Sequence, residues 1–430
     1  MNARRLALVL IAALFLLTVL IGWRVALLPL LFLNAFVLLH LGLASLRRVL
    51  FTLAARQTPC ETPAPPADFV LPRLTALVHC RDEAAALPAT LAAWAAVDYP
   101  RDRLELVFID DSSADETPGL LEAFARDKPW VKVVRRAAPA AGKGAALNDG
   151  LANAAPAELV AVFDADARPA PDCPRLLAER LADPTVAGVA GRMSPLEHDH
   201  PAAVYAAVEA AVHQRLTLTG AARLGATVAF LGSAYAVRRS LLDPDGFAPG
   251  ERLEDIELSL RLLAEGYQLA WEPRAVCRHL APADTAAFRR QRESWARGYH
   301  RLARRYYAPL VLAAPSPLLA FDRLLFCASY LDRFSLLAAI ALAALARWVL
   351  PILWMPWWFV ASAAALPLLQ IPLAVRADGW PATRRRRVAP ALALVFWDFA
   401  AEWRALAADL AGKPLPWRRA DRAPEPRGES

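Results

Sequence analysis

Acidic residues suited to metal-assisted chemistry recur in the middle of this chain, each group next to an apolar run. They are Asp110-Asp111, Asp164-Ala165-Asp166 and Glu254-Asp255. Carboxylates at the ends of strands can hold a divalent cation against a diphosphate and still leave one carboxylate to act as a base. Further along, Gln291 and Trp295 lie four residues apart on a predicted helix and therefore share one face. The pattern predicts a site for a diphosphate-linked substrate.

The elements that must position these acids are predicted from alternating strand-like and helix-like segments. Apolar runs typical of buried strands occupy residues 74–78, 104–109, 131–134 and 159–163, with helical patterns over residues 83–96 and from residues 115 and 143 onward. Such alternation predicts an α/β domain with a mainly parallel sheet that is covered on both faces. Ligands bind beyond the carboxyl ends of these strands. We therefore expect Asp110-Asp111 and Asp164-Ala165-Asp166 to lie at one edge of the sheet.

The composition places part of the chain in lipid. Of the 430 residues, 57% are hydrophobic, and the mean hydropathy is +0.29. Residues 6–23 and 25–46 lack Asp, Glu, Lys and Arg, and each segment is long enough to cross about 30 Å of hydrocarbon. Only Arg24 separates them, which predicts a transmembrane hairpin. The competing interpretation of residues 1–23 is a cleaved signal peptide.

Arginines flank the predicted hairpin on both sides. Arg4 and Arg5 precede it, and Arg47, Arg48 and Arg56 follow it. By the positive-inside rule both ends lie in the cytoplasm. The sequence therefore predicts an integral protein of the inner (cell) membrane with a cytosolic central domain.

The C-terminal part alternates between interfacial and spanning patterns. Residues 317–330 carry Leu318, Phe321 and Leu325 on one helical stripe with Asp322 and Arg323 opposite, which predicts a helix in the membrane interface. Two spans are predicted next, over residues 334–350 and 353–375, and they return to the cytoplasm at the arginines of residues 384–387. Residues 388–410 are long enough to span. We interpret them as an in-plane or partly inserted helix, because a fifth span would export the basic tail.

The predicted organisation follows from these boundaries. It comprises a hairpin in residues 1–50, a Pro-rich linker in residues 51–70, the α/β domain in residues 71–310, an interfacial helix with C-terminal spans in residues 311–412, and a basic cytosolic tail in residues 413–430.

The charge and cysteine patterns narrow the partners and the compartment. The net charge of +7 comes largely from basic residues beside apolar blocks, which favours anionic lipid headgroups over nucleic acid. The five cysteines have neither CxxC nor metal-ligand spacing, so we expect reduced thiols in a cytosolic domain.

The order of the motifs resembles that of family 2 glycosyltransferases with the Rossmann-like GT-A fold. Within this family the chain resembles the membrane-integrated synthases, which include cellulose, hyaluronan and poly-N-acetylglucosamine synthases. The resemblance covers roughly residues 70–300. Its motifs are Asp110-Asp111-Ser112-Ser113, Gly142-Lys143-Gly144 with Ala145-Ala146-Leu147-Asn148, Asp164-Ala165-Asp166, Glu254-Asp255 and Gln291-Arg292-Glu293-Ser294-Trp295.

The resemblance implies an inverting hexosyltransferase that uses a nucleotide sugar, with Mg²⁺ or Mn²⁺ as cofactor. UDP is the commonest nucleotide among these synthases, and GDP stays open. The implied partners are the nucleotide-sugar donor, a glycan or lipid acceptor, membrane lipids and polysaccharide-export proteins. Two alternatives are non-processive glycosylation of a membrane lipid and a catalytically dead membrane scaffold.

Donor-binding roles are implied for residues in the first half of the domain. Asp111 takes the position that recognises uridine, and Arg81 and Glu83 contact the nucleotide. The alternative is that Asp110-Asp111 only forms a turn and a helix cap. Lys143, between two glycines at a helix start, is suited to phosphate oxygens, or else is a solvated lysine. In the DxD motif, Asp164 faces the donor and Asp166 binds the metal.

Acceptor and catalytic roles are implied for the second half. Asp255 corresponds to the general base, and Leu253 replaces the threonine of the family's TED motif; the alternative is that Glu254 and Asp255 only complement a helix N-terminus. Gly232 belongs to the acceptor-side segment.

The family's QxxRW motif is altered in this chain. Gln291 and Trp295 are present and are expected to contact the acceptor sugar, although Trp295 could instead be an interfacial anchor. Ser294 replaces the arginine that usually contacts the diphosphate. Arg290 and Arg297 lie within a helical turn of Ser294, and our hypothesis is that one of them restores the charge.

Overall fold

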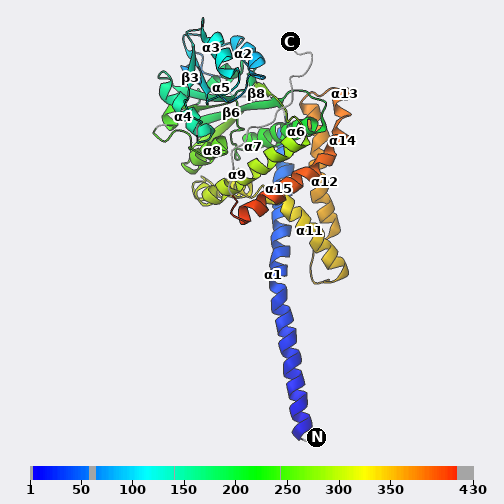
Figure 1. Cartoon of the computed structure of the whole chain (residues 1–430). Coiled ribbons are helices and arrows are strands. Elements are labelled where there is room, and N and C mark those ends of the chain that lie inside the picture. Colours follow the sequence, from blue (N-terminus) through cyan, green and yellow to red (C-terminus); the bar gives the residue numbers. More distant parts are fainter. Residues whose placement is uncertain (1–2, 58–63, 140, 243, 414–430) are drawn as a thin grey trace. The chain divides into compact units, whose positions relative to one another are not determined.

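A computed structural model describes residues 3–57, 64–139, 141–242 and 244–413, and Figure 1 shows the order of its elements. The chain divides into two compact units. The smaller unit comprises Met1–Arg47 and Ser329–Leu369, and the larger comprises Arg48–Ala328 and Gln370–Ser430.

An eight-stranded sheet in the order β3-β2-β1-β4-β7-β6-β8-β5 forms the centre of the larger unit. Its first half is parallel and consists of β3 (Val131–Arg135), β2 (Leu104–Asp110), β1 (Leu74–Cys80) and β4 (Leu159–Asp164). These are the four strands that the apolar runs predict. In the register, Cys80 lies beside Asp110, and His79 lies beside Asp164. The three strands β2, β1 and β4 therefore end together at one edge.

The second half of the sheet makes the architecture mixed. It consists of β5 (Arg168–Pro169), β6 (Val186–Pro195), β7 (Tyr235–Arg238) and β8 (Gln268–His279). Strand β7 pairs antiparallel with both β4 and β6, while β6 and β8 are parallel and β5 is antiparallel to β8. The prediction of a mainly parallel sheet therefore holds for β1 to β4.

Helices bury both faces of the sheet because side chains along each strand alternate between them. On β2, Leu106 and Phe108 join one hydrophobic core, and Val107 and Ile109 join the other. The covering elements are α2 (Leu87–Ala95), α3 (Thr117–Ala125), α4 (Lys143–Asn153), α5 (Cys173–Arg180), α6 (Pro201–Ala211), a π-helix (Val212–Leu218), α7 (Thr219–Arg223), a short 3-10 helix (Arg239–Leu241) and α8 (Glu254–Ala264).

The remaining helices follow β8 in the chain. They are α9 (Thr285–Leu312), α10 (Pro317–Cys327), α11 (Leu331–Trp348), α12 (Trp357–Ala377), α13 (Ala382–Arg385), α14 (Val388–Ala391), a 3-10 turn (Leu392–Leu394) and α15 (Val395–Leu410). In the larger unit, α9 contacts α8, α10 and α15. It therefore connects the catalytic half of the chain with its C-terminal part.

Helix α10 turns its charged side chains toward protein and its apolar ones outward. The Asp322 carboxylate accepts a hydrogen bond from the backbone N–H of Thr227 at 2.8 Å, and the Arg323 guanidinium donates to the Leu310 carbonyl at 2.8 Å. Leu318 is 78% exposed. Phe321 is also exposed, whereas Leu325 is buried and does not belong to the outer stripe. The predicted helix is present, with two of its three apolar residues exposed, and its place in a membrane interface stays a prediction.

The predicted N-terminal hairpin is wrong. A single helix α1 of 53 residues (Ala3–Ala55) continues through Arg24 and contains Pro29. Two antiparallel helices need a connecting loop of about two to five residues, and one arginine between apolar helix-forming residues supplies none. The same helix includes residues 51–55, which we expected to belong to the Pro-rich linker. Residues 58–63 of that linker lie outside the described residues.

The smaller unit buries the polar groups of its apolar segments. Asn34 donates to the Trp354 carbonyl at 3.3 Å, and His40 Nε2 lies 3.0 Å from an oxygen of Asp332. Apolar residues of α1, α11 and α12 pack around them, including Val37, Leu41, Ala339, Leu342 and Val360. Buried polar side chains in such segments face protein rather than lipid, as His40 and Asn34 do.

The helices that could cross a membrane differ from the predicted set. Among the described residues, Leu27–Ala55 and Trp357–Ala377 are long and apolar enough. The second overlaps the span predicted over residues 353–375 and is a candidate span by length and composition. The span predicted over residues 334–350 qualifies only as part of the pair α10 and α11, which is bent by 77°. Helix α15 does not qualify and packs against α9, which agrees with our choice against a fifth span.

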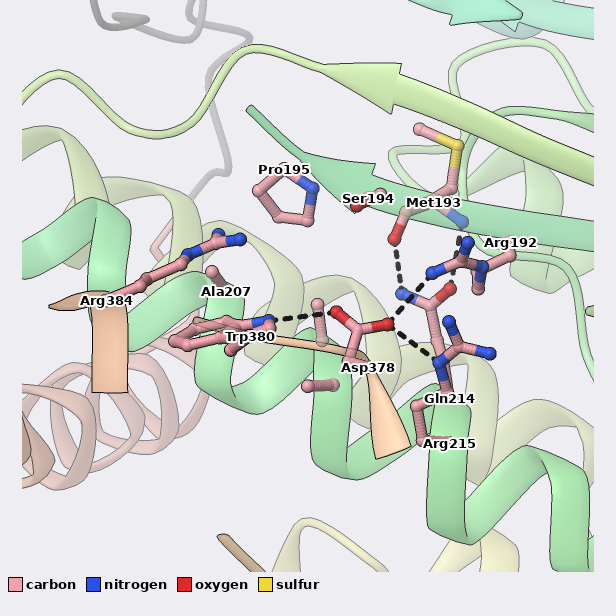
Figure 2. Close-up of a pocket in the computed structure, with 12 residues that line it drawn as sticks. Arg192, Met193, Ser194, Pro195, Ala207, Gln214, Arg215, Asp378, Trp380 and Arg384 are labelled. Atoms are coloured by element: carbon pink, nitrogen blue, oxygen red, sulfur yellow. Dashed lines mark hydrogen bonds and ion pairs between the residues drawn. The ribbon is translucent and has the colours of Figure 1, made fainter. Parts of the chain in front are cut away.

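The segment that follows α12 is attached to the sheet through Asp378 (Figure 2). The Asp378 carboxylate accepts hydrogen bonds from Arg192 on β6 at 2.9 Å, from Arg215 on the π-helix at 2.7 Å and from the Trp380 indole at 3.0 Å. The Arg384 guanidinium lies 3.8 Å from the centre of the Trp380 ring. One carboxylate therefore joins three separate elements of the larger unit.

Replacing Asp378 by alanine should destabilise the larger unit. The side chains of Arg192 and Arg215 are only 17% and 24% exposed, and removing one partner of a buried ion pair costs roughly 3 kcal/mol. Thermal unfolding of detergent-solubilised Asp378→Ala should show a clearly lower midpoint. Asp127→Ala, which removes an exposed carboxylate beside Lys128, is the control and should leave the midpoint unchanged. Equal midpoints for both variants would contradict the proposed attachment.

Candidate active site

Directly after β2, two arginines and a histidine surround the carboxylate of Asp111. This carboxylate is 3% exposed. Its oxygens lie 3.0 Å from Arg136 Nε, 3.3 Å from His79 Nε2 and 3.9 Å from Arg81. Neighbouring positive and hydrogen-bonding groups compensate for the burial of a carboxylate. The predicted residues Asp111 and Arg81 are therefore together, and His79 and Arg136 join them.

The neighbouring Asp110 has a different task. Its side chain accepts a hydrogen bond from the backbone N–H of Ser113 at 3.2 Å, and Ser112 adopts a φ of 61°. These are features of a tight turn that a short polar side chain stabilises. Glu83 is buried on the facing loop, where its backbone N–H donates to Thr117 Oγ1 at 2.8 Å. Asp110 thus fits the turn interpretation, while the donor-binding role of Asp111 stays a prediction.

The DxD motif directly follows the end of β4. Asp164 Oδ1 accepts from the Lys143 ammonium at 2.6 Å, and the Asp164 backbone N–H donates to Ser233 Oγ at 2.9 Å. Asp166 is 3% exposed, and its Oδ2 accepts from the Leu280 backbone N–H at 3.1 Å. Lys143 on α4 therefore holds the Asp164 carboxylate, and the backbone just after β8 holds the Asp166 carboxylate.

These two carboxylates fit a hard divalent cation that also binds a substrate. Across residues 3–57, 64–139, 141–242 and 244–413, no group of three His, Cys, Asp or Glu side chains gathers as a complete metal site. Mg²⁺ is usually held by one or two carboxylates together with substrate phosphates. The carboxylates of Asp164 and Asp166 have the oxygen donors that such a partial site requires.

Lys143 is half-buried, and its side chain, which is 17% exposed, lies among the acidic residues. Its ammonium donates to Asp164 at 2.6 Å, to Glu254 at 2.9 Å and to the Gly232 carbonyl at 3.0 Å. Burial alone would lower the pKa of Lys143, but the charges of Asp164 and Glu254 outweigh burial and raise it. An ammonium has three donors, and these contacts use all of them. These contacts do not fit the interpretation of Lys143 as a solvated lysine, and its predicted role in binding phosphate oxygens stays a prediction.

Asp255 begins α8 beside this cluster. Its carboxyl is 6% exposed, and a Cβ placed on Gly232 would lie 3.9 Å from its Oδ2. Burial and the nearby charge of Glu254 raise the pKa of Asp255 to about 7, although Lys143 acts in the opposite direction. A carboxylate with a pKa near neutrality is suited to take up a proton during a reaction. Its neighbour Glu254 is instead tied to Lys143.

Close backbone packing fixes the loop that precedes Asp255. A Cβ on Gly144 would lie 2.5 Å from the Ala248 carbonyl oxygen, and one on Gly298 would lie 2.9 Å from the Leu253 side chain. The Gly250 backbone N–H donates to the Ala141 carbonyl. The loop between the 3-10 helix (Arg239–Leu241) and α8 therefore packs tightly between the start of α4 and helix α9.

The predicted site residues on α9 differ in how far they are exposed to solvent. Arg290 and Trp295 are exposed, Gln291 is half-buried, and the Arg292 guanidinium lies 4.8 Å from the Trp295 ring centre. Arg297 is buried and donates to Asp409 on α15 at 2.8 Å. Arg297, three residues after Ser294, thus connects α9 with α15. The hypothesis that Arg297 restores the charge at Ser294 is not supported by these contacts.

The contacts instead bring Arg252 to Ser294. Arg252 Nε donates to Ser294 Oγ at 2.6 Å. Burial lowers the pKa of Arg252, and the charge of Glu254 opposes this. Sequence reasoning missed this residue, as it missed His79, Arg136 and Ser233. The only available signal was that an arginine stands two positions before the Glu254-Asp255 motif.

Two family profiles match the region that contains this site. Residues 75–218 match the profile of "Glycosyl transferase family 2", and residues 159–368 match that of "Glycosyl transferase family group 2". Between them the profiles include the strands β1 to β8 and the helices α2 to α11.

The chain is also similar to curated proteins. It is 29% identical over 233 residues to a probable glycosyltransferase, YdaM, of Bacillus subtilis, which covers 53% of this chain and 55% of that protein. It is 29% identical over 234 residues to the beta-monoglucosyldiacylglycerol synthase of Synechocystis, covering 53% and 48%. It is 27% identical over 245 residues to the poly-beta-1,6-N-acetyl-D-glucosamine synthase of Staphylococcus epidermidis, covering 55% and 56%. The chain thus spans about half the length of these relatives.

Among solved structures, the chain is similar to a mannosyltransferase from Pyrobaculum calidifontis in complex with GDP-Man and Mn²⁺. The sequence identity is 26%, the TM-score is 0.56, and the alignment covers 89% of this chain and all of the other. The likeness confirms the predicted GT-A glycosyltransferase fold.

Gly144→Ala should destabilise the site, because its Cβ would clash with the backbone of Ala248. Overpacking of this kind costs about 1 to 3 kcal/mol. Gly119→Ala on α3 is the matched control. A Cβ there meets nothing within 4 Å, and alanine in a helix is favoured over glycine by up to about 1 kcal/mol. Denaturant unfolding should separate the two variants in opposite directions. A Gly144→Ala protein as stable as Gly119→Ala would show that the loop is not wedged at α4.

Proposed function

The chain belongs to glycosyltransferase family 2, and on this basis we propose that it transfers a sugar, with inversion, from a nucleoside diphosphate sugar to an acceptor hydroxyl at a membrane. The observation that carries the proposal is the half-buried cluster in which Lys143 joins Asp164 to Glu254, next to Asp255. This cluster combines carboxylates for a metal-bound donor with a base of suitable pKa.

Asp255 acts as the general base in the proposed reaction. Its carboxylate takes the proton from the acceptor hydroxyl while the hydroxyl oxygen attacks the anomeric carbon. The new C–O bond forms as the bond from the anomeric carbon to the diphosphate oxygen breaks, and the nucleoside diphosphate leaves with the bonding electron pair. Single displacement inverts the anomeric centre, so that an α-linked donor gives a β-linked product. Glycine at position 232 leaves space beside Asp255 Oδ2 for the acceptor.

The donor occupies the edge where β1, β2 and β4 end. Asp111 is placed to accept hydrogen bonds from the base or ribose, because it directly follows β2 at the edge where β1 and β4 also end. Asp164 and Asp166 would hold Mg²⁺ or Mn²⁺, which when bound offsets the charge that develops on the leaving diphosphate. We expect a UDP sugar from the family resemblance, and the similar mannosyltransferase structure makes GDP sugars the first comparison.

A membrane setting is supported by the apolar helices. Leu27–Ala55 and Trp357–Ala377 are candidate spans, and α10 exposes Leu318 and Phe321. The arginines at positions 47, 48 and 56 precede the catalytic domain, which favours a cytosolic location for it. Because α1 is one helix and not a hairpin, the N-terminus and the catalytic domain are no longer separated by two spans. The hairpin argument that placed the N-terminus in the cytoplasm therefore no longer applies. The acceptor is accordingly a membrane lipid or a growing glycan.

The test is release of nucleoside diphosphate by the purified full-length chain in lipid nanodiscs. A panel of UDP and GDP sugars should contain at least one donor that is turned over with Mg²⁺ or Mn²⁺ and not with excess chelator. Radiolabelled product would then identify the acceptor class, since a ladder indicates polymer synthesis and one labelled lipid indicates single transfer. Absence of turnover and of nucleotide binding with every donor would instead support a non-catalytic scaffold.

The rate should depend on the ionisation of Asp255. The carboxylate is the active form, so the turnover rate should fall as the pH is lowered through about 7, the value to which burial and Glu254 raise the pKa of this side chain. Asp255→Asn should lose about 10² to 10⁴ in rate and lose this pH dependence. Asp245→Asn removes an exposed carboxylate and should behave as the wild type. A full rate for Asp255→Asn would refute the assignment of the base.

A further inference from the structure

In the altered QxxRW motif, Ser294 contacts an arginine from another part of the chain. Ser294 stands where the resemblance expects an arginine, and its Oγ accepts a hydrogen bond of 2.6 Å from Arg252 Nε. The two residues are 42 positions apart, on the loop before α8 and in the middle of α9. An arginine therefore reaches this position of α9 from a different element.

Other cations near the site have different commitments. The ammonium of Lys143 already donates to Asp164, Glu254 and the Gly232 carbonyl. Arg297 is held by Asp409 and by the Lys413 carbonyl. The contacts of Lys143 and Arg297 therefore do not favour either residue as the source of positive charge for a diphosphate near Ser294.

The packing of the loop holds Arg252 beside the donor site. Gly298 allows Leu253 to lie directly against α9, and the Gly250 N–H bond to Ala141 fixes the other end of the loop to the segment before α4. Glu254, two residues after Arg252, contacts Lys143, which contacts Asp164 of the DxD motif. A short chain of contacts thus connects Arg252 with the predicted metal ligands.

We propose that Arg252 binds the diphosphate of the donor and takes the place of the arginine that Ser294 replaces. The inference rests on the proposed function. A guanidinium presents its N–H donors in a planar fork that matches two phosphate oxygens, and the hydrogen bond to Ser294 sets the orientation of that plane. The Arg252 side chain is partly buried, and the loop that carries it packs against α9 through Leu253.

The experiment is calorimetric titration of the full-length chain in nanodiscs with UDP and with GDP, in the presence of Mg²⁺ or Mn²⁺. Arg252→Ala should weaken binding of the nucleoside diphosphate by roughly 10- to 100-fold, as expected for lost charge-assisted hydrogen bonds. Binding of the nucleoside monophosphate should change much less. Arg301→Ala is the control, because Arg301 is half-exposed and pairs with Glu251 of the same loop.

A double variant, Arg252→Ser with Ser294→Arg, places the guanidinium back on α9. It should recover most of the diphosphate affinity. Wild-type affinity in Arg252→Ala, equal losses for mono- and diphosphate, or no recovery in the double variant would each overturn the proposal. A wild-type chain that binds neither diphosphate would instead refute the proposed function itself, so the two failures are distinct.

Discussion

The ammonium of Lys143 is the interaction on which the site depends. It joins the end of β4 at Asp164, the start of α8 at Glu254 and the Gly232 carbonyl before β7. Without it, the neighbouring carboxylates of Asp164, Glu254 and Asp255 would repel one another. Lys143 forms ion pairs with Asp164 and Glu254, while burial and the charge of Glu254 raise the pKa of Asp255 to about 7. One side chain thereby assigns different electrostatic roles to neighbouring carboxylates.

The sequence predicted what depends on local pattern. Strands β1 to β4 appear as apolar runs, and because parallel strands end together, the convergence of Asp111 and Asp164 followed from topology. The hairpin failed because hydrophobicity reports how long an apolar segment is but not whether it turns. Arg252 was missed because its contact with Ser294 crosses 42 residues. The burial of Lys143 was also invisible, since a lysine between glycines looks the same in a solvated loop.

Helix α10 shows how an amphipathic pattern can be assigned to the wrong environment. Its charged residues, Asp322 and Arg323, are satisfied by the backbone groups of Thr227 and Leu310, so that the protein is the polar surrounding. Leu318 and Phe321 are left outside. The sequence pattern alone gives two faces, and only the tertiary contacts say which of them the protein covers. In this helix the polar face is the buried one.

Two residues of α9, three positions apart, contact different parts of the chain. Ser294 accepts a hydrogen bond from Arg252 on the loop before α8. Arg297 donates to Asp409 on α15, and the Asp409 carboxylate also lies 3.1 Å from His300. Asp409 lies beyond residue 368, where the matched family region ends. A truncation designed on the family boundary would strip this carboxylate from a guanidinium that is 8% exposed. Soluble catalytic fragments of this chain should therefore retain the C-terminal helix.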